Sequence, residues 1–372
     1  TYSVYGVDSF GNALGGRLAD ARATTGTVRA VLVAGALAAL FGLAVVRLCQ
    51  GSAALAALPL WPRIALLTGL TCFPPAFGLS MLTPLAIRLT LPDVRRTGGV
   101  VGAIYALGTL GSLAGNFLTG FVLLAFFSTH TIVTGVAATL LALALVAPSG
   151  GGREAAGADG APAPAASAES LTLAAACAIA FGSSFCSMAV EIAASRLLAP
   201  HVGVSLYSWT GIIGVVLFGM ALGNAWGGRL ADRFPRRDVL GASLFAAGLS
   251  GLFTVFMHDA LARAKGLEEL DLVARILIWS GLLFLPVAVF LGTISPQVTR
   301  LAVADVAHAG RVAGRIYAWS CAGAILGTFA TGWGLIALFG VARLIAGVSA
   351  ALMLNAVAAG RMWRRPRDLS AC

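Results

Sequence analysis

Long apolar runs, separated by short stretches rich in arginine and glycine, dominate the pattern of this chain. Each run has about 20 residues or more with few charges, enough to cross a hydrocarbon core about 30 Å thick. The apolar positions are continuous and do not alternate, which predicts helices, because backbone groups in lipid must bond to one another. The predicted helices are 1–16, 28–48, 64–91, 99–126 and 130–147, then 171–199, 205–228, 238–257, 273–299, 311–338 and 341–360.

The composition agrees with a membrane protein. Hydrophobic residues make up 59% of the chain and charged residues 11%, and the mean hydropathy is +0.91. A soluble domain carries roughly 25% charged residues, so this chain cannot cover itself with a wet surface. We therefore predict an all-α integral membrane protein of about eleven transmembrane helices, with the lipid bilayer as its partner.

The net charge of +10 does not indicate nucleic-acid binding. The arginines lie mostly between apolar runs, at every second connection, as the positive-inside rule places them. One side holds the larger set, which we predict to be cytoplasmic: Arg17, Arg22, Arg95, Arg96, Arg153, Arg233, Arg236, Arg237, Arg311 and the tail 361–367. The other side holds Arg63, His130, His201, Arg343 and the mixed segment 258–275. This pattern predicts a multi-pass protein with a cytoplasmic C-terminus.

The chain contains an internal duplication. GNALGGRLAD at Gly11–Asp20 returns as GNAWGGRLAD at Gly223–Asp232, an offset of 212 residues. The same offset relates GAIYALGTLGSLAGNFLTG, from Gly102, to GRIYAWSCAGAILGTFATG, from Gly314. Similar segments in one register, without gaps, predict two parallel repeats of one six-helix unit.

The repeats set the domain boundaries. We predict a first transmembrane repeat of five helices at 1–147 and a second of six helices at 171–360. Between them, the Gly, Ala and Pro content of 148–170 predicts a flexible cytoplasmic linker, and 361–372 forms a basic cytoplasmic tail. The first repeat lacks a counterpart of 171–199. Either the native chain starts earlier, or this repeat has lost its first helix and part of the next.

The repeated motifs favour close helix contacts. The paired glycines of GGRLAD let another backbone approach, and its aspartate can contact a helix terminus. The motif is either an orientation and packing device or a latch that forms and breaks as the two halves rock. Its residues are Gly16, Arg17, Asp20, Gly228, Arg229, Asp232 and Arg233. The small-xxx-small pairs Gly111 with Gly115 and Gly323 with Gly327 predict tight helix packing.

Several of these motifs resemble known families. GGRLADRFPRRDVL, from Gly227, looks like the loop motif of the major facilitator superfamily. More narrowly, EIAASRLLAPHVGVSLYSW (from Glu191), SPQVTRL (from Ser295) and GRIYAWSCAGAILGTFATGW (from Gly314) resemble the membrane half of bacterial fused facilitator-type and spermidine synthase proteins.

The resemblance implies a twelve-helix, two-bundle fold in a bacterial inner membrane, followed by a soluble aminopropyltransferase-type domain. This sequence departs from that pattern, because it contains neither the first helix nor the soluble domain. No Gly-rich strand-to-helix turn with a following acidic residue is present, so we expect no adenosyl cofactor and no synthase activity from this chain.

Few polar residues within the spans could contact a solute. Charged residues inside a membrane are costly and indicate function. Glu191 could bind a cationic amine or a proton, or could pair with a neighbouring helix at a boundary. Asp8 and Asn12 lie four residues apart on one helix face, and either line a cavity or are exposed on a terminal helix. The predicted substrate-binding residues are Glu191, Arg196, Asn12, Asn224 and Asp8.

Other chemistry is not indicated. The six cysteines show no paired spacing, and the four histidines show no metal-ligand spacing, so we predict no metal, no cofactor and no catalytic residue. The aromatic residues Tyr105, Tyr317 and Trp319 are expected to be interfacial anchors.

Two functions remain as hypotheses. One is a facilitator-like domain that binds or transports a small amine-type solute, a cation being one option. The other is a non-transporting anchor or accessory subunit of a larger complex, with further membrane subunits or a soluble synthase-like domain as partners.

Overall fold

The computed structural model describes residues 2–22, 24–50, 52, 57–147, 170–263 and 271–361. Throughout these residues the regular secondary structure is helical. Ten of the described helices are long and apolar enough to cross a membrane. The all-α membrane class is therefore confirmed. The predicted linker (148–169) and the basic tail (from 362 onward) lie outside the described residues.

The first repeat begins with α1, which is less apolar than the ten spans, and continues with four further spans. Thr24 and Ser128 begin two of its helices, and each hydroxyl accepts a hydrogen bond from the backbone three residues on. The elements are α1 (Tyr2–Arg22), α2 (Thr25–Cys49), α4 (Leu60–Ser80), α5 (Leu82–Thr90), the 3₁₀ turn η1 (Val94–Arg96), α6 (Thr97–Phe117), the π-helical η2 (Leu118–Leu123), α7 (Leu124–Phe126) and α8 (Thr129–Val146).

The second repeat contains all six predicted helices. Side chains of Thr172, Ser205 and Asp271 cap three of them. The elements are α9 (Leu173–Val202), α10 (Leu206–Arg233), α11 (Arg237–Ala262), α12 (Leu272–Ala302), α13 (Ala309–Ala330), the π-helical η4 (Thr331–Leu335), α14 (Ile336–Phe339) and α15 (Val341–Arg361).

The helices that carry GGRLAD extend beyond their predicted ends. We expected them to stop at residues 16 and 228, but α1 continues to Arg22 and α10 to Arg233. The glycine pair does not end the helix here, because neighbouring backbones pack against it on both sides. The aspartate of each motif is consequently presented from the last turn of a helix.

Irregular backbone occurs in both repeats. The predicted helix 64–91 divides at Met81 into α4 and α5, and Pro84 lies in the first turn of α5, where a missing backbone N–H costs little. Its counterpart α12 continues through Pro286 and Pro296. The π segment η4 corresponds, at the offset of 212 residues, to the last five residues of η2, so the distortion is itself duplicated.

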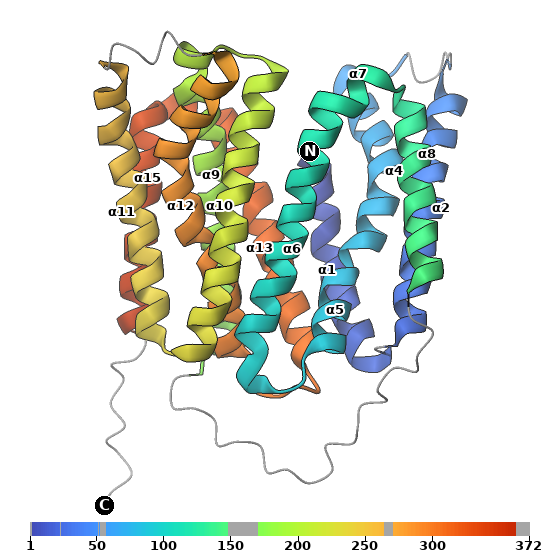
Figure 1. Cartoon of the computed structure of the whole chain (residues 1–372), viewed down its shortest axis with the longest axis horizontal. Coiled ribbons are helices and arrows are strands. Elements are labelled where there is room, and N and C mark those ends of the chain that lie inside the picture. The colour runs from blue at the N-terminus through green and yellow to red at the C-terminus, as the bar shows by residue number, and fades with distance from the viewer. Residues whose placement is uncertain are drawn as a thin grey trace, which may run out of the picture.

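The two repeats differ in how much core they enclose. Figure 1 shows α9 to α15 on one side and α1, α2, α4, α5 and α8 on the other, with α6 and α13 towards the boundary. In the second repeat, α12 is the helix most enclosed by its neighbours, with Leu283 and Phe284 almost completely buried in one continuous core. In the first repeat, the described core is a small cluster around Leu85 and Met81. The difference arises because the described first repeat has no helix equivalent to α9.

Candidate functional site

The carboxylate of Asp232 joins the two repeats. It lies in the last turn of α10 and reaches the first turn of α6 in the other repeat. The amide of Gly98 donates to Oδ1 at 2.8 Å, and the amide of Gly99 donates to Oδ2 at 2.6 Å. The first amides of a helix have no partner within it and carry partial positive charge, so a carboxylate there is stabilising. Arg300 Nε of α12 forms an ion pair with Oδ1 at 3.7 Å.

Asp20 makes the equivalent contact between α1 and α13. It lies near the end of α1 and reaches the first turn of α13. The backbone amide of Arg311 donates to Asp20 Oδ2 at 3.1 Å, and the guanidinium Nε of Arg311 lies 3.6 Å from the same oxygen. Gly310 and Arg311 stand 212 residues after Gly98 and Gly99. Each repeat therefore caps a helix of the other, and we call these two contacts the carboxylate caps.

The second glycine of each GGRLAD motif lies at a crossing between repeats. A Cβ placed on Gly228 would lie 2.6 Å from the carbonyl oxygen of Gly98, and one placed on Gly16 would lie 2.6 Å from that of Gly310. The first glycine of each pair packs within its own repeat. A Cβ on Gly227 would lie 2.5 Å from the Cα of Thr293 in α12. The two glycines thus permit close contacts in two directions at once.

The structure places Asn12 and Asn224 at these same crossings. Both are buried, and their carbonyl oxygens lie against Gly314 and Gly102 of the opposite repeat. The offset that relates the two asparagines also relates the two glycines. Asn12 and Asn224 therefore belong to the contact between the two repeats. Their role as solute ligands stays a prediction.

The arginines of the motif take no part in the carboxylate caps. Arg17 and Arg229 are exposed, and no hydrogen bond or ion pair joins either to another described residue. Arg233 is exposed as well, with its guanidinium carbon 5.5 Å from the ring centroid of Phe234. The caps instead use backbone amides together with Arg300 and Arg311, two arginines from outside the motif.

Glu191 lies near the middle of α9 and is partly buried. Among the described residues, no hydrogen bond or ion pair reaches its carboxylate. Arg196 lies one and a half turns further along α9 and is exposed, so the two residues point to different faces of the helix. The side chain of Asp8 lies outside the described part of the chain.

The two glycine pairs in the membrane differ in their packing. A Cβ on Gly323 would lie 2.1 Å from the carbonyl oxygen of Phe181, and one on Gly327 would lie 2.5 Å from that of Phe185, both in α9. The equivalent positions Gly111 and Gly115 of α6 have no described neighbour within 4 Å. The tight packing predicted for both pairs is present for the second and absent from the described contacts of the first, because no described helix occupies the place that α9 occupies on α13.

Several polar and aromatic contacts were not expected from the sequence. Tyr105 and Tyr317 were predicted as membrane anchors, but their rings meet across the repeats with centroids 5.5 Å apart. The Nε2 atoms of His201 and His258 lie 3.2 Å apart, and His201 stacks on Trp279 at 4.3 Å. These contacts join residues far apart in the sequence, so no local spacing could indicate them.

The loop before α13 contains a local pair of an aspartate and a histidine. Asp305 accepts a hydrogen bond from the Ala307 amide at 2.9 Å and lies 2.9 Å from His308 Nδ1. The amide hydrogen bond, and after it the histidine, hold the pKa of Asp305 below its usual range. This carboxylate–histidine pair was not expected from the sequence. No group of three metal-ligating side chains occurs in the described ranges.

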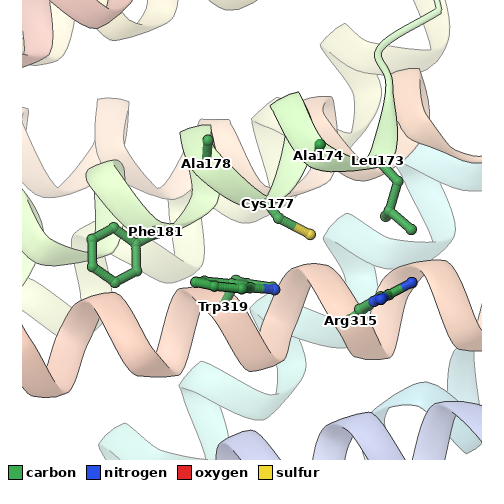
Figure 2. Close-up of a pocket in the computed structure, with 7 residues that line it drawn as sticks. All are labelled: Leu173, Ala174, Cys177, Ala178, Phe181, Arg315 and Trp319. Atoms are coloured by element: carbon green, nitrogen blue, oxygen red, sulfur yellow. The ribbon is translucent and has the colours of Figure 1, made fainter.

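A pocket of about 620 Å³ opens between α9 and α13, near the end of the bundle that bears GGRLAD. Its lining residues are Leu173, Ala174, Cys177, Ala178, Phe181, Arg315 and Trp319 (Figure 2). The walls are apolar except for Arg315. Figure 2 shows the guanidinium of Arg315 and the indole of Trp319 on successive turns of α13, both facing α9.

Comparison with known proteins identifies the fold. No family model and no curated protein matches this chain. Among solved structures, one described as a bacterial homologue of the iron transporter ferroportin, in an outward-facing state, matches with a TM-score of 0.58. The match covers 98% of this chain and 90% of that chain, at 11% sequence identity. The chain therefore has a major-facilitator-like fold, as predicted, and the low identity limits the likeness to the fold.

Proposed function

We propose that this chain is a transporter whose two halves rock about the carboxylate caps. The observation that carries the proposal is the reciprocal pair of caps, in which Asp20 and Asp232 each bond to the first turn of a helix in the other repeat. A permanent joint between two domains typically buries large interlocking side chains. Here the described joint at this end combines glycine backbones and charge-assisted hydrogen bonds with small apolar clusters, one of them formed by Leu91, Val303 and Ala309.

The energy of such a joint suits a reversible movement. A hydrogen bond to a charged group contributes about 1.5–3 kcal/mol to stability. Two conformations that differ by a few kcal/mol can both be populated, and a ligand can shift the balance between them. The fold of the outward-facing transporter structure, matched over almost the whole chain, supports the same reading.

For the solute, we propose a small amine. Glu191 is a carboxylate within a membrane span, and no described group neutralises it, so a cationic amine or a proton would complete the site. The resemblance of the segment from Glu191 to Trp209 to spermidine-synthase-linked membrane domains supports the amine class.

The experiment is uptake of radiolabelled spermidine, and separately of labelled methylamine, into vesicles that contain the purified chain. We expect saturable uptake of at least one amine, reduced about ten-fold or more by Glu191→Gln because the charge partner is lost. Arg343→Gln, which removes an exposed charge from α15, should leave uptake unchanged. Absence of uptake above protein-free vesicles would refute the transport proposal.

A second function has one observation in its favour. The glycine face of α6 at Gly111 and Gly115 contacts no described residue, which suits a membrane module packed against another helix in a larger complex. Mass measurement of the complex after mild detergent extraction tests this alternative. Stoichiometric partner subunits would favour it, and a chain isolated alone at 37.7 kDa would not.

A further inference from the structure

We infer that the pocket between α9 and α13 is a binding site for an anionic phospholipid of the surrounding membrane. The inference concerns a pocket that includes neither the cap aspartates nor Glu191, and it does not depend on transport. It rests on the position of the pocket, its single charge and the apolar surface that continues from it.

The pocket lies on the side of α13 that faces away from the first repeat. Gly310 and Gly314 of α13 face α1. Trp319 follows Gly310 by nine residues, which at 100° per residue is half a rotation of the helix. Trp319 therefore points away from the contact between repeats, and it is 50% exposed.

The inner end of the pocket is closed by helix contacts. Phe181 and Trp319 meet edge to face with ring centroids 6.2 Å apart. Next to this contact, Ser184 Oγ and Ser320 Oγ share a hydrogen bond, and one turn beyond Trp319 the residue Gly323 brings α13 against the backbone of α9. On the GGRLAD side of these contacts, Leu173 of α9 and Arg315 of α13 line the rest of the pocket.

Arg315 gives the pocket its chemical preference. Among the described residues, no carboxylate and no hydrogen-bond partner is paired with its side chain. A guanidinium beside apolar walls favours an anion that brings an apolar chain with it, and it disfavours the cationic amine proposed as the solute. Arg315 lies six residues into α13, about 9 Å along the helix, so its side chain can reach the headgroup boundary.

The exposed face of α13 continues as a track for an acyl chain. Leu326 follows Trp319 by two turns and lies on the same face, and both side chains are about half exposed (52% and 50%). A phospholipid has a charged headgroup followed by apolar acyl chains. Its headgroup would bind at Arg315, and an acyl chain would lie along Trp319 and Leu326.

The feature belongs to the second repeat only. The positions equivalent to Arg315 and Trp319 are Ala103 and Leu107 in α6. Residues needed only for the duplicated fold would be expected in both copies. The arginine and tryptophan therefore point to a local role.

The test uses the full chain in vesicles of phosphatidylcholine and phosphatidylglycerol at four to one, extracted gently and weighed by native mass spectrometry. We expect retained phosphatidylglycerol, with retention reduced about five-fold in Arg315→Gln, since one basic residue attracts an anionic lipid by about that factor. Arg315→Lys should keep most of the retention, and Arg343→Gln is the matched control for loss of one exposed arginine.

A second measurement uses phosphatidylglycerol brominated on its acyl chains, which quenches nearby tryptophan. Quenching should fall in Trp319→Phe, and Leu107→Ala at the equivalent place in the first repeat should not alter it. Equal lipid retention by the wild type and Arg315→Gln, or equal losses in Arg315→Gln and Arg343→Gln, would overturn the inference. These measurements do not involve amine uptake, so their outcome is independent of the test of the proposed function.

Discussion

At the scale of single residues, the aspartates of GGRLAD are the clearest case in which a sequence motif anticipated a contact. The motif predicted that an aspartate would meet a helix terminus, and Asp20 and Asp232 do so. The sequence could not say which terminus, because the partner amides are 291 and 134 residues away. The aspartates pair with Arg300 and Arg311, which lie outside the motif, and not with the arginine of the motif itself.

Asp232→Asn tests the cap at the residue scale. An amide keeps one acceptor oxygen but loses the charge and one of the two backbone hydrogen bonds, so the cap should weaken by about 1.5–3 kcal/mol. We expect the amides of Gly98 and Gly99 to exchange hydrogen at least about ten-fold faster, measured by mass spectrometry of peptides from the start of α6.

The matched control is Asp238→Asn. Asp238 also pairs with an arginine, Arg236 at 3.2 Å, but both side chains are about half exposed, so the pair contributes little. Exchange at the start of α6 should not change. If Asp232→Asn behaves like this control, the cap does not hold the two repeats together.

At the scale of helices, hydropathy predicted the number and order of the spans, whereas interruptions depended on packing. The division of the helix predicted at 64–91 into α4 and α5 and the π segments η2 and η4 are not marked by composition. The glycine pairs show the limit most clearly, because Gly111 and Gly323 occupy equivalent places in the repeat but have different surroundings.

Alanine substitutions at these two glycines should have opposite effects. In Gly323→Ala the new Cβ would lie 2.1 Å from a backbone oxygen of α9, so the helices must separate, at a cost of about 1–3 kcal/mol. In Gly111→Ala the Cβ meets no described atom within 4 Å, and reduced backbone freedom should stabilise the helix by about 0.4–1 kcal/mol.

The measurement is the midpoint of thermal unfolding in one detergent, followed by tryptophan fluorescence. Gly323→Ala should lower the midpoint and Gly111→Ala should raise it slightly. A fall of similar size in both variants would mean that the glycine face of α6 is covered in the purified protein.

At the scale of the whole molecule, duplication explains why the joint has two equivalent parts. The crossing of α10 with α6 and the crossing of α1 with α13 repeat the same glycine, asparagine and aspartate contacts. Because the two caps lie on different helix pairs, loss of one leaves the other to hold the halves.

Spin labels at Arg17→Cys and Arg229→Cys measure the separation of the halves. Both positions are exposed, one lies in each repeat, and neither bonds to a described residue. In a background without the native cysteines, electron paramagnetic resonance should give one narrow distance. Asp20→Asn together with Asp232→Asn should add a population at longer distance, and each single change should add less.

The distances from the double variant decide between the two roles of GGRLAD. A distribution indistinguishable from that of the unsubstituted aspartates would make the motif a packing and orientation device. A shift that appears only when both carboxylates are neutral would identify it as a latch.

The sequence by itself determined the membrane class, the helical content and the duplication. These properties depend on the length of apolar runs and on a repeated register, which are local and additive along the chain. Which residues contact one another was decided by the tertiary structure. Asn12 and Asn224 are buried where helices of the two repeats cross. The packing of α9 against α13 forms the pocket beside Arg315. Such contacts depend on which helix lies beside which, and no hydropathy pattern contains that information.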